Sequence, residues 1–413
     1  MKTSGDTVEG FPVRNRWAVA ALGLSVFVVT TAEMMPVGLL PYLSADFAVS
    51  EGIAGLTVTL YGVVAGVFAP ILTAVTRRID RRSLIMLILS VFVAGNIVTA
   101  LASNFVVLLV CRLAVGFVHG LLWSVMAAIA VRLVAPRYAV RATSFVFSGI
   151  SLALVLGVPL GSVIGDRLDW RAAFWILVVL SAAALAMVAV AMPRMAPTGG
   201  VALREIPTLF AVTNLRIAVA VTALVVVANY AAYTYIAPYL IDDVGIDKTA
   251  VGALLLGYGI AGLAGNLVSG SIVARSESLR PVLAAYLAAL SISLILLVAS
   301  GSWTIAVCVL VIVWGGAYSA VPIALQTLVL RSAADRGEAA TSLYVLVFNS
   351  SIAAGALFGG LAIDRAGASA PLILGAIVCL IALVVVGCCD LGRPTAAVGN
   401  GTPASVVDRK AQS

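Results

Sequence analysis

Twelve long apolar stretches make up most of the sequence and limit what the chain can fold into. Each is about as long as the roughly 20 residues that a helix needs to cross the hydrocarbon core of a bilayer. Strands of a membrane barrel would be about ten residues long and would alternate in polarity, a pattern that these stretches lack. We therefore predict an all-α membrane protein with twelve transmembrane helices, at 17–41, 52–76, 83–103, 105–133, 141–165, 171–192, 215–240, 249–274, 281–300, 302–330, 339–363 and 370–389.

Composition and charge support this class and exclude others. Of the 413 residues, 62% are hydrophobic and 10% are charged, whereas about 25% of the residues in a soluble domain are charged. A water-soluble enzyme is thereby excluded, and much of the surface is expected to face the lipid bilayer. A net charge of +7 would fit a nucleic-acid partner if the basic residues formed one exposed domain, but they are spread over the breaks between the spans. We expect no nucleic acid to bind.

The basic residues indicate how the chain is oriented. When the breaks are assigned alternately to the two sides of the membrane, almost all of the 25 Lys and Arg residues fall on one side. The exceptions are Arg167, Arg171, Lys248 and Arg365 on the other side, and Arg112 within a span. Because short cytoplasmic loops are enriched in Lys and Arg, both termini are predicted to be cytoplasmic.

The longest polar break divides the twelve spans into two sets of six. We predict a cytoplasmic tail at 1–16, six-helix bundles at 17–192 and 214–390, a cytoplasmic central loop at 193–213, and a disordered cytoplasmic tail at 391–413. A shift of 198 residues pairs Asp166-Arg167 with Asp364-Arg365, which indicates two pseudo-repeats that run in the same sense. Transporters built from such repeats bind their substrate near the bilayer midplane, between the halves.

Two ionisable residues lie inside the predicted spans. An ionisable side chain within the bilayer is costly, so it is expected to face a cavity or a partner. We predict that Glu33 carries a coupling proton and that Arg112 pairs with it, either directly or through a bound substrate. The alternative interpretation of Glu33 is a neutral carboxyl group that is hydrogen-bonded between helices.

Further polar and aromatic residues in the spans are candidate substrate contacts. His119 and Trp123 follow Arg112 at spacings of seven and eleven residues, which places all three on one helix face. The candidates in the second half are Asn229, Tyr230, Tyr233, Asn266, Gln326 and Asn349. Rings combined with amide and hydroxyl groups suit sugars or mixed polar and aromatic drugs. Each candidate has a structural alternative, because a lone histidine can make an internal hydrogen bond and amides can join neighbouring helices.

Small residues at four-residue spacing are candidate conformational positions. Gly157, Pro159 and Gly161 lie in one span, and Gly355 and Gly359 lie in its counterpart. Small residues at this spacing let helices approach closely. We interpret them as packing positions that can also form a sliding seam between the halves. No grouping of His and Cys indicates a metal site.

Several motifs resemble those of one known family. They are Thr31-Ala32-Glu33 with Pro36 to Pro41, Arg112 to Gly120, Gly157 to Gly165 with Trp170-Arg171, Tyr233 to Pro238, and Asn349 to Gly360. Together they resemble the major facilitator superfamily, specifically its twelve-span drug:proton antiporter branch, which includes sugar and arabinose-type efflux transporters. The resemblance implies the major facilitator fold, with Glu33 as the proton carrier, Arg112 supporting the coupling, and His119, Trp123, Asn229, Tyr230 and Asn349 along the substrate path.

One cytoplasmic loop departs from the pattern of the family. The loop usually reads Gly-x-x-x-Asp-Arg-x-Gly-Arg-Lys/Arg, and here Arg77 stands in place of the Asp and Asp80 in place of the second Gly. The basic residues Arg78, Arg81 and Arg82 are kept. The chain therefore lacks the Asp of the usual charge-paired latch, although Asp80 can supply a displaced partner. A solvated loop that only sets orientation is the alternative.

The expected function is proton-coupled efflux of small molecules by alternating access, with sugars or sugar-like compounds ahead of hydrophobic drugs. The absence of a phosphate-binding loop with a Lys favours the proton gradient over a bound cofactor or ATP as the energy source. Such a chain is not an enzyme, contributes to drug resistance, and works as a monomer in the bacterial inner membrane. A proton-coupled importer and a non-transporting membrane sensor are the alternatives.

Overall fold

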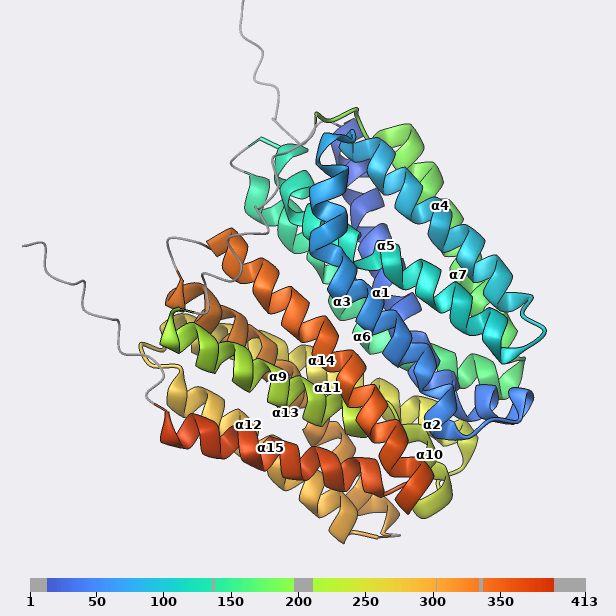
Figure 1. Cartoon of the computed structure of the whole chain (residues 1–413), viewed down its shortest axis with the longest axis vertical. Helices are drawn as coiled ribbons and strands as arrows, with labels where there is room; N and C mark the ends of the chain where they lie inside the picture. Colours follow the sequence, from blue (N-terminus) through green and yellow to red (C-terminus); the bar gives the residue numbers. More distant parts are fainter. Residues whose placement is uncertain (1–12, 136–137, 197–210, 302, 334–336, 390–413) are drawn as a thin grey trace, which may run out of the picture.

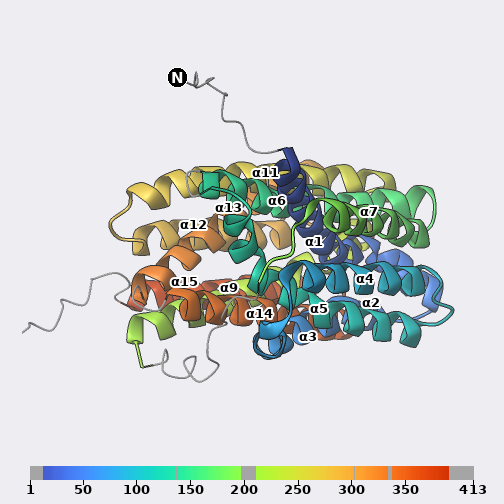
Figure 2. The same ribbon diagram turned by 90° about the horizontal axis from the view of Figure 1, so that it is seen from above.

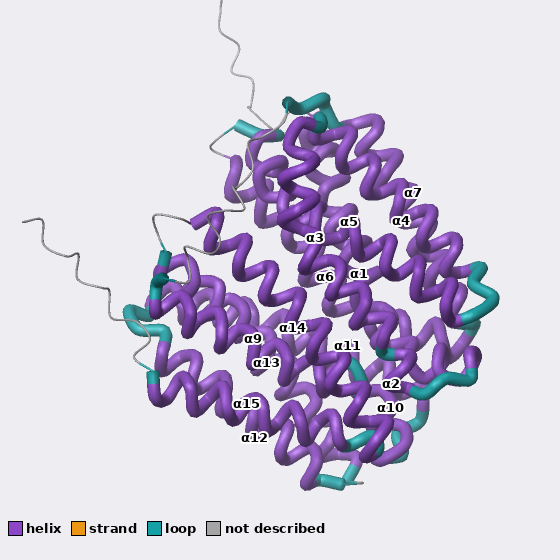
Figure 3. Tube along the Cα trace, in the orientation of Figure 1, coloured by secondary structure: helices purple, strands orange, loops and turns teal. Residues whose placement is uncertain are grey.

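The computed structural model describes residues 13–135, 138–196, 211–301, 303–333 and 337–389. Within these ranges the regular secondary structure is entirely helical, as the tube drawing shows (Figure 3). Twelve of the described helices are long and apolar enough to cross a membrane. The predicted number of spans and the all-α class are therefore confirmed.

The helix bounds agree with the predicted spans to within a few residues at most ends. The first half consists of α1 (Val13–Phe47), the short α2 (Glu51–Ala54), α3 (Leu56–Val75), α4 (Arg81–Ala100), α5 (Phe105–Arg132), α6 (Ala139–Arg167) and α7 (Trp170–Ala191). The second half consists of α9 (Thr213–Tyr233), the short α10 (Ile236–Pro238), α11 (Lys248–Arg275), α12 (Arg280–Ala299), α13 (Thr304–Ser332), α14 (Gly337–Ala366) and α15 (Ala370–Cys388). The predicted tails, apart from residues 13–16, and most of the central loop lie outside the described residues.

Two of the predicted spans differ from the helices, and proline is involved in both. The first helix runs on to Phe47 through Pro36 and Pro41, beyond the predicted end at 41. The predicted span 215–240 is instead interrupted after Tyr233, and a short turn precedes Pro238. Because the proline ring removes a backbone N–H and crowds the preceding turn, a helix continues through a proline only where other groups satisfy the freed carbonyl.

The two halves form two groups of helices that meet along two seams. Helices α1–α7 lie at the upper right of Figure 1 and α9–α15 at the lower left, and the view from above shows the same division (Figure 2). Between the groups, α3 packs against α14 and α6 packs against α11. The apolar core of the second half also takes in Met34, Val37 and Val158 from the first half. The seams therefore place α1 and α5 of one half opposite α9 and α13 of the other.

The halves repeat one another in detail. In the first half α1 packs on α6 and α3 on α5, and in the second half α9 packs on α14 and α11 on α13. A Cβ on Gly116 would lie 2.7 Å from the Tyr61 carbonyl oxygen, and a Cβ on Gly315 would lie 2.3 Å from the Tyr258 carbonyl oxygen. These equivalent helix crossings are so close that only glycine fits without a shift of the backbone.

Arginines gather at the helix ends on one side of the molecule, which we call the basic face. It carries Arg81, Arg82, Arg132, Arg280 and Arg331. Arg82, Arg132, Arg280 and Arg331 donate side-chain hydrogen bonds to backbone carbonyls at or near the ends of neighbouring helices. Such carbonyls have no partner within their own helix. We call the other side the opposite face.

The predicted conformational glycines pack against helices of their own half and do not lie between the halves. A Cβ on Gly161 would lie 2.8 Å from the Met35 carbonyl oxygen on α1, and one on Gly359 would lie 2.4 Å from the Ala231 carbonyl oxygen on α9. Gly157 and Gly355 face the same two helices. These glycines therefore pack helices together within each half, and the predicted seam between the halves is wrong for them. Pro159 does lie at that seam, where its carbonyl oxygen is 3.4 Å from the Cβ position of Gly252.

Candidate functional site

A buried cluster of ionisable and aromatic side chains lies at the centre of the first half. Glu33 comes from α1, Tyr61 from α3, and Arg112 and His119 from α5, and all four are buried. His119 Nε2 lies 3.5 Å from Glu33 Oε2, and His119 Nδ1 lies 2.7 Å from the Tyr61 hydroxyl oxygen. Glu33 Oε1 makes no hydrogen bond within the described part of the chain. A buried carboxyl oxygen without a partner is costly, so this atom is a candidate site for a proton or a substrate hydroxyl.

Arg112 is held by backbone carbonyls. Its Nη1 donates to the Ala32 carbonyl oxygen at 2.8 Å, its Nη2 to that of Glu33 at 3.4 Å, and its Nε to that of Thr57 at 3.1 Å. Its Cζ lies 4.2 Å from the centre of the Tyr61 ring, a cation–π distance. Among the described residues, no ion pair joins its guanidinium to the Glu33 carboxylate within 4.0 Å. The predicted direct pairing is therefore not present in this conformation, and His119 holds the position next to the carboxylate.

Pro36 explains why Arg112 binds where it does. In a helix the Ala32 carbonyl oxygen would accept a hydrogen bond from the backbone N–H four residues later. Residue 36 is a proline and has no N–H, so the carbonyl of Ala32 is free, and the guanidinium of Arg112 takes its place. This bond lets α1 continue through Pro36. The sequence contained the signal, a proline four residues after Ala32, but not the identity of the donor.

Trp123 completes the cluster and limits the protonation state of His119. Its indole Nε1–H donates to His119 Nε2 at 2.9 Å. Because an indole N–H can only donate, Nε2 must accept, and the proton of a neutral imidazole is assigned to Nδ1, toward the Tyr61 hydroxyl. The Trp123 ring also contacts the Phe147 ring of α6, with centroids 6.0 Å apart.

A second cluster, mainly aromatic, lies in the other half. The Trp314 indole N–H donates to Asn229 Oδ1 at 2.9 Å, and the rings of Tyr233 and Tyr258 stack with centroids 4.6 Å apart. Tyr230 and Tyr318 make an edge-to-face contact. Asn229, Tyr230 and Tyr233 were predicted, whereas Tyr258, Trp314 and Tyr318 were not. The repeat carried a signal for Tyr258, since its counterpart is Tyr61.

The two clusters face each other across the interface between the halves. The Tyr230 hydroxyl lies 3.8 Å from Met34 Sδ, and Met34 follows Glu33 on α1. Asn349 lies at the α3–α14 seam beside Gly66, but its amide donates to Val345 of its own helix. Among the described residues, Asn266 and Gln326 make no hydrogen bond to either cluster, and Gln326 is exposed. The structure thus brings most of the predicted residues into the two clusters, but not Asn266, Gln326 or Asn349.

On the opposite face, a clasp of Ser50, Gly52 and Asp364 joins the halves. The Ser50 hydroxyl donates to Asp364 Oδ2 at 2.8 Å, and the Gly52 backbone N–H donates to Asp364 Oδ1 at 3.0 Å. Asp364, at the end of α14, thus caps the first turn of α2 in the other half. A carboxylate is favourable at a helix N-terminus, because the backbone N–H groups there lack partners.

The α6–α11 seam shows on which side the halves separate. Toward the opposite face it is closed, with Val163 against Gly252 and Val155 against Gly259. Toward the basic face the residues that continue along the seam are exposed: Phe145 (55%), Leu152 (51%), Leu263 (40%) and Leu267 (65%). The two halves are therefore in contact at the opposite face, whereas these residues toward the basic face are not covered by the other half.

Loss of the clasp should open the opposite face. In Asp364→Ala, two hydrogen bonds to a charged group disappear, each worth about 0.7 kcal/mol at this exposed site. We expect roughly tenfold faster labelling of a cysteine placed at the buried Ala353, measured with a membrane-impermeant maleimide and mass spectrometry. Asp166→Ala is the control, since Asp166 is the repeat counterpart and accepts no cross-half hydrogen bond from the described residues. Equal labelling in both variants would show that the clasp does not close this face.

In the loop between α3 and α4, Asp80 accepts hydrogen bonds from backbone N–H groups. Asp80 caps α4 by accepting from the Ser83 backbone N–H at 3.0 Å, and it also accepts from the Met195 backbone N–H at 2.6 Å. Partial burial works to raise the pKa of Asp80, but these hydrogen bonds outweigh burial and hold the pKa below its ordinary value. Through these bonds Asp80 ties the loop to the chain after α7, and its role as a displaced ionic partner stays a prediction. Arg78 is exposed, and the side chain of Arg77 lies outside the described part.

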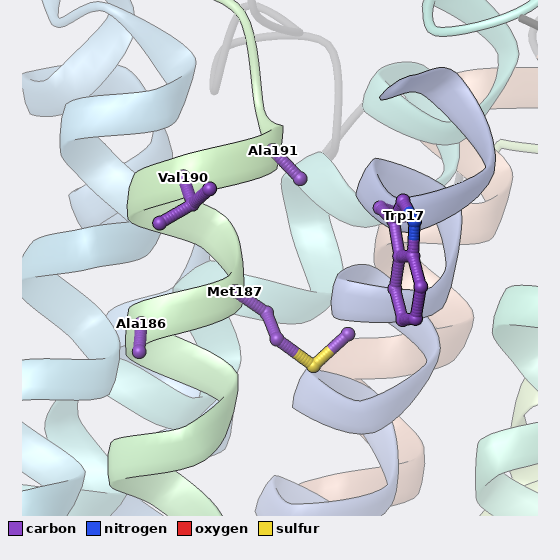
Figure 4. Close-up of a pocket in the computed structure, with 5 residues that line it drawn as sticks. All are labelled: Trp17, Ala186, Met187, Val190 and Ala191. Atoms are coloured by element: carbon purple, nitrogen blue, oxygen red, sulfur yellow. The ribbon is translucent and has the colours of Figure 1, made fainter. Parts of the chain in front are cut away.

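A cavity of about 530 Å³ lies apart from both clusters, at the basic-face ends of α1 and α7. Its lining is Trp17, Ala186, Met187, Val190 and Ala191, and Figure 4 shows Trp17 and Met187 on its two sides. The lining is apolar, and Trp17 occupies the position of an interfacial anchor. The polar residues of the candidate site do not reach it. Within the described ranges, no three His, Cys, Asp or Glu side chains are placed to hold a metal ion.

Comparisons with known proteins agree with this architecture. The sequence profile of the Major Facilitator Superfamily matches residues 22–219 and 218–408. The structure resembles that of a bacterial homologue of the human lysosomal transporter Spinster in an inward-facing, occupied conformation, with a TM-score of 0.74 and 14% identity over 92% of this chain and 97% of that one. It also resembles the human organic anion transporter MFSD10 (TETRAN), with a TM-score of 0.65 and 17% identity over 91% of this chain and all of that one. At these identities the likeness concerns the fold.

Proposed function

Since this chain belongs to the Major Facilitator Superfamily and is a secondary transporter that works by alternating access, we propose that it exports small molecules in exchange for protons. The family makes it a multi-pass membrane protein and not an enzyme. In this proposal the basic face is cytoplasmic, in accordance with the positive-inside rule, the membrane is the bacterial inner membrane, and a single chain is the working unit.

The environment of Glu33 carries the proposal of proton coupling. Its carboxyl group is buried between α1 and α5, with one oxygen near the titratable His119 and the other without a hydrogen-bond partner among the described residues. A charge in such a place is unfavourable unless it is paired, so gain and loss of a proton change the energy of the cluster strongly. A site of this kind can link protonation to the arrangement of the helices around it.

The second cluster supports an uncharged, hydroxyl-rich substrate. Asn229, the tyrosine hydroxyls and the faces of Tyr233, Tyr258 and Trp314 present hydrogen-bonding groups beside flat apolar surfaces. Sugar rings offer the complementary combination of hydroxyl groups and apolar C–H faces, so we place sugars and sugar-like compounds first and hydrophobic drugs second. No acidic or basic side chain contributes to this second cluster among the described residues.

The open side of the molecule supports the direction of transport. The halves separate toward the basic face and are held together at the opposite face by the clasp. With the basic face cytoplasmic, this is the conformation in which an exporter would take up its substrate. The resemblance of Gly157 to Gly165 to the antiporter motif favours the same direction.

Transport into proteoliposomes under an imposed pH gradient tests the proposal. An antiporter accumulates substrate when the lumen is acidic, because outward proton flow drives inward substrate flow, whichever way the protein is inserted. We expect one or more solutes from a panel of labelled sugars, nucleosides and drugs to accumulate in this way, and a protonophore to abolish the accumulation. Accumulation driven by an acidic exterior would instead show an importer, and no movement of any solute would favour a sensor.

A further inference from the structure

One nitrogen atom, His119 Nε2, has two competing neighbours. Trp123 Nε1 lies 2.9 Å away and donates to it, and Glu33 Oε2 lies 3.5 Å away. An imidazole nitrogen has a single in-plane position, which holds either a proton of its own or an accepted hydrogen bond. While the indole N–H occupies this position, His119 cannot take a proton from Glu33 there.

We propose that Trp123 links substrate binding to proton movement by controlling access to His119 Nε2. A substrate that displaces the indole frees the nitrogen to accept the Glu33 proton. The proposal rests on the proposed function and extends it, because it names the residue that makes proton release depend on the substrate.

The position of Trp123 fits this role. Residues Val106, Val110 and Phe117 are exposed and mark the outer side of α5. At 100° per residue, Trp123 lies about 100° to 140° round the helix from these three residues and about 20° from Arg112. The exposed part of the partly buried Trp123 side chain is therefore on the side of α5 that faces the other helices. His119, one turn earlier on the same face, is completely buried. The indole covers the imidazole on the side from which a substrate would arrive.

The proposed proton transfer runs from the Glu33 carboxyl group to His119 Nε2 and needs no group from outside the cluster. The Glu33 O–H bond breaks and an N–H bond forms at His119 Nε2, which gives a carboxylate next to an imidazolium, and the proton then passes to water at the basic face. The Nδ1 proton stays directed to the Tyr61 hydroxyl oxygen throughout. The ionisable groups around His119 are Glu33 from α1, Tyr61 from α3 and Arg112 from α5 itself, and Arg112 keeps a positive charge close to the new carboxylate. From α6 the neighbour of Trp123 is Phe147, which cannot ionise.

A spectroscopic test is direct, because His119 is the only histidine in the chain. Protein labelled with ¹⁵N-histidine should give a single imidazole whose nitrogen shifts report which atom carries the proton. For the wild type without substrate we expect Nδ1 protonated and Nε2 unprotonated. In Trp123→Phe, which keeps a ring and loses the N–H, we expect a clearly larger fraction of protonated Nε2 at the same pH. Adding Glu33→Gln to this variant should reverse the change, because the donated proton is gone.

The matched control is Trp314→Phe, which removes a buried indole donor in the cluster of the other half, bonded to Asn229. It should leave the His119 spectrum as in the wild type. Identical spectra for the wild type and Trp123→Phe, or an Nε2 that is already protonated in the wild type, would overturn the proposal. If Trp123→Phe does not fold, a protonated Nε2 in the substrate-free wild type still overturns the proposal. Because no substrate is needed, this outcome is independent of whether the transport assay succeeds.

Discussion

Glu33→Gln should lower proton-driven transport to the level of protein-free liposomes. The amide has nearly the same shape as the protonated carboxyl group but can neither release nor accept the coupling proton, so the cycle loses its driving step. Any substrate binding that remains in Glu33→Gln should not depend on pH across the range in which the wild-type affinity changes. Accumulation under an acidic lumen, together with binding measured at several pH values, checks both parts.

The control for this variant is Glu277→Gln. Glu277 is an exposed carboxyl group in the break between α11 and α12, so the same chemical change there should leave transport within about twofold of the wild type. If Glu33→Gln transports at the wild-type rate under a pH gradient, Glu33 does not carry the coupling proton, and the alternative of a hydrogen-bonded structural carboxyl becomes the better account.

Arg112→Ala should cause the second large effect, on both stability and pH dependence. The variant leaves the Ala32 carbonyl without a partner, because Pro36 cannot supply one, and a buried group in that state costs about 1–3 kcal/mol. It also removes a positive charge close to Glu33, which influences how readily the Glu33 carboxyl group gains and loses its proton. The pH at which transport is fastest should therefore change as well. A loss of stability with an unaltered pH profile would leave Arg112 a structural role only.

A double-mutant cycle can isolate the contact between Arg112 and the freed carbonyl. Pro36→Ala restores the missing N–H to α1, so Arg112→Ala should destabilise the Pro36→Ala background less than the wild type. Pro41→Ala is the matched control, since it restores an N–H to the same helix at a carbonyl that Arg112 does not bind. Thermal unfolding of the four proteins in each cycle gives the coupling energy. Equal coupling in both cycles would contradict the assignment.

Helical periodicity was sufficient to predict the spans and the face of α5 that carries Arg112, His119 and Trp123. It could not predict that His119, and not Arg112, lies beside the Glu33 carboxylate, since that depends on how α1, α3 and α5 dock. Trp314 escaped notice for a similar reason, because its significance comes from a contact with Asn229 on another helix. The hydrogen bonds that Asp80 accepts from Ser83 and Met195 could not be predicted either, because a loop sequence does not show which backbone N–H groups a carboxylate will meet.

The glycines also show what sequence spacing cannot predict, namely which helix is the packing partner. Four-residue spacing correctly indicated close approach of helices at Gly161 and Gly359. Spacing contains no information on the partner, however, and the partners are α1 and α9 within each half. A rigid body needs such contacts in its interior, whereas Val155, Gly252 and Gly259 make contacts between the two halves.

The arginines of the basic face have one role during membrane insertion and another in the folded protein. During membrane insertion their charge would select the side of the bilayer, for which lysine serves equally well. After folding, the guanidinium groups of Arg82 and Arg280 bond to the last carbonyls of α7 and α15, a task that depends on the planar fork of arginine. Lysine at these positions would therefore preserve the orientation of the newly made chain but weaken the packing of the folded bundle. In each of these arginines, the charge serves membrane insertion and the shape of the guanidinium group serves the folded structure.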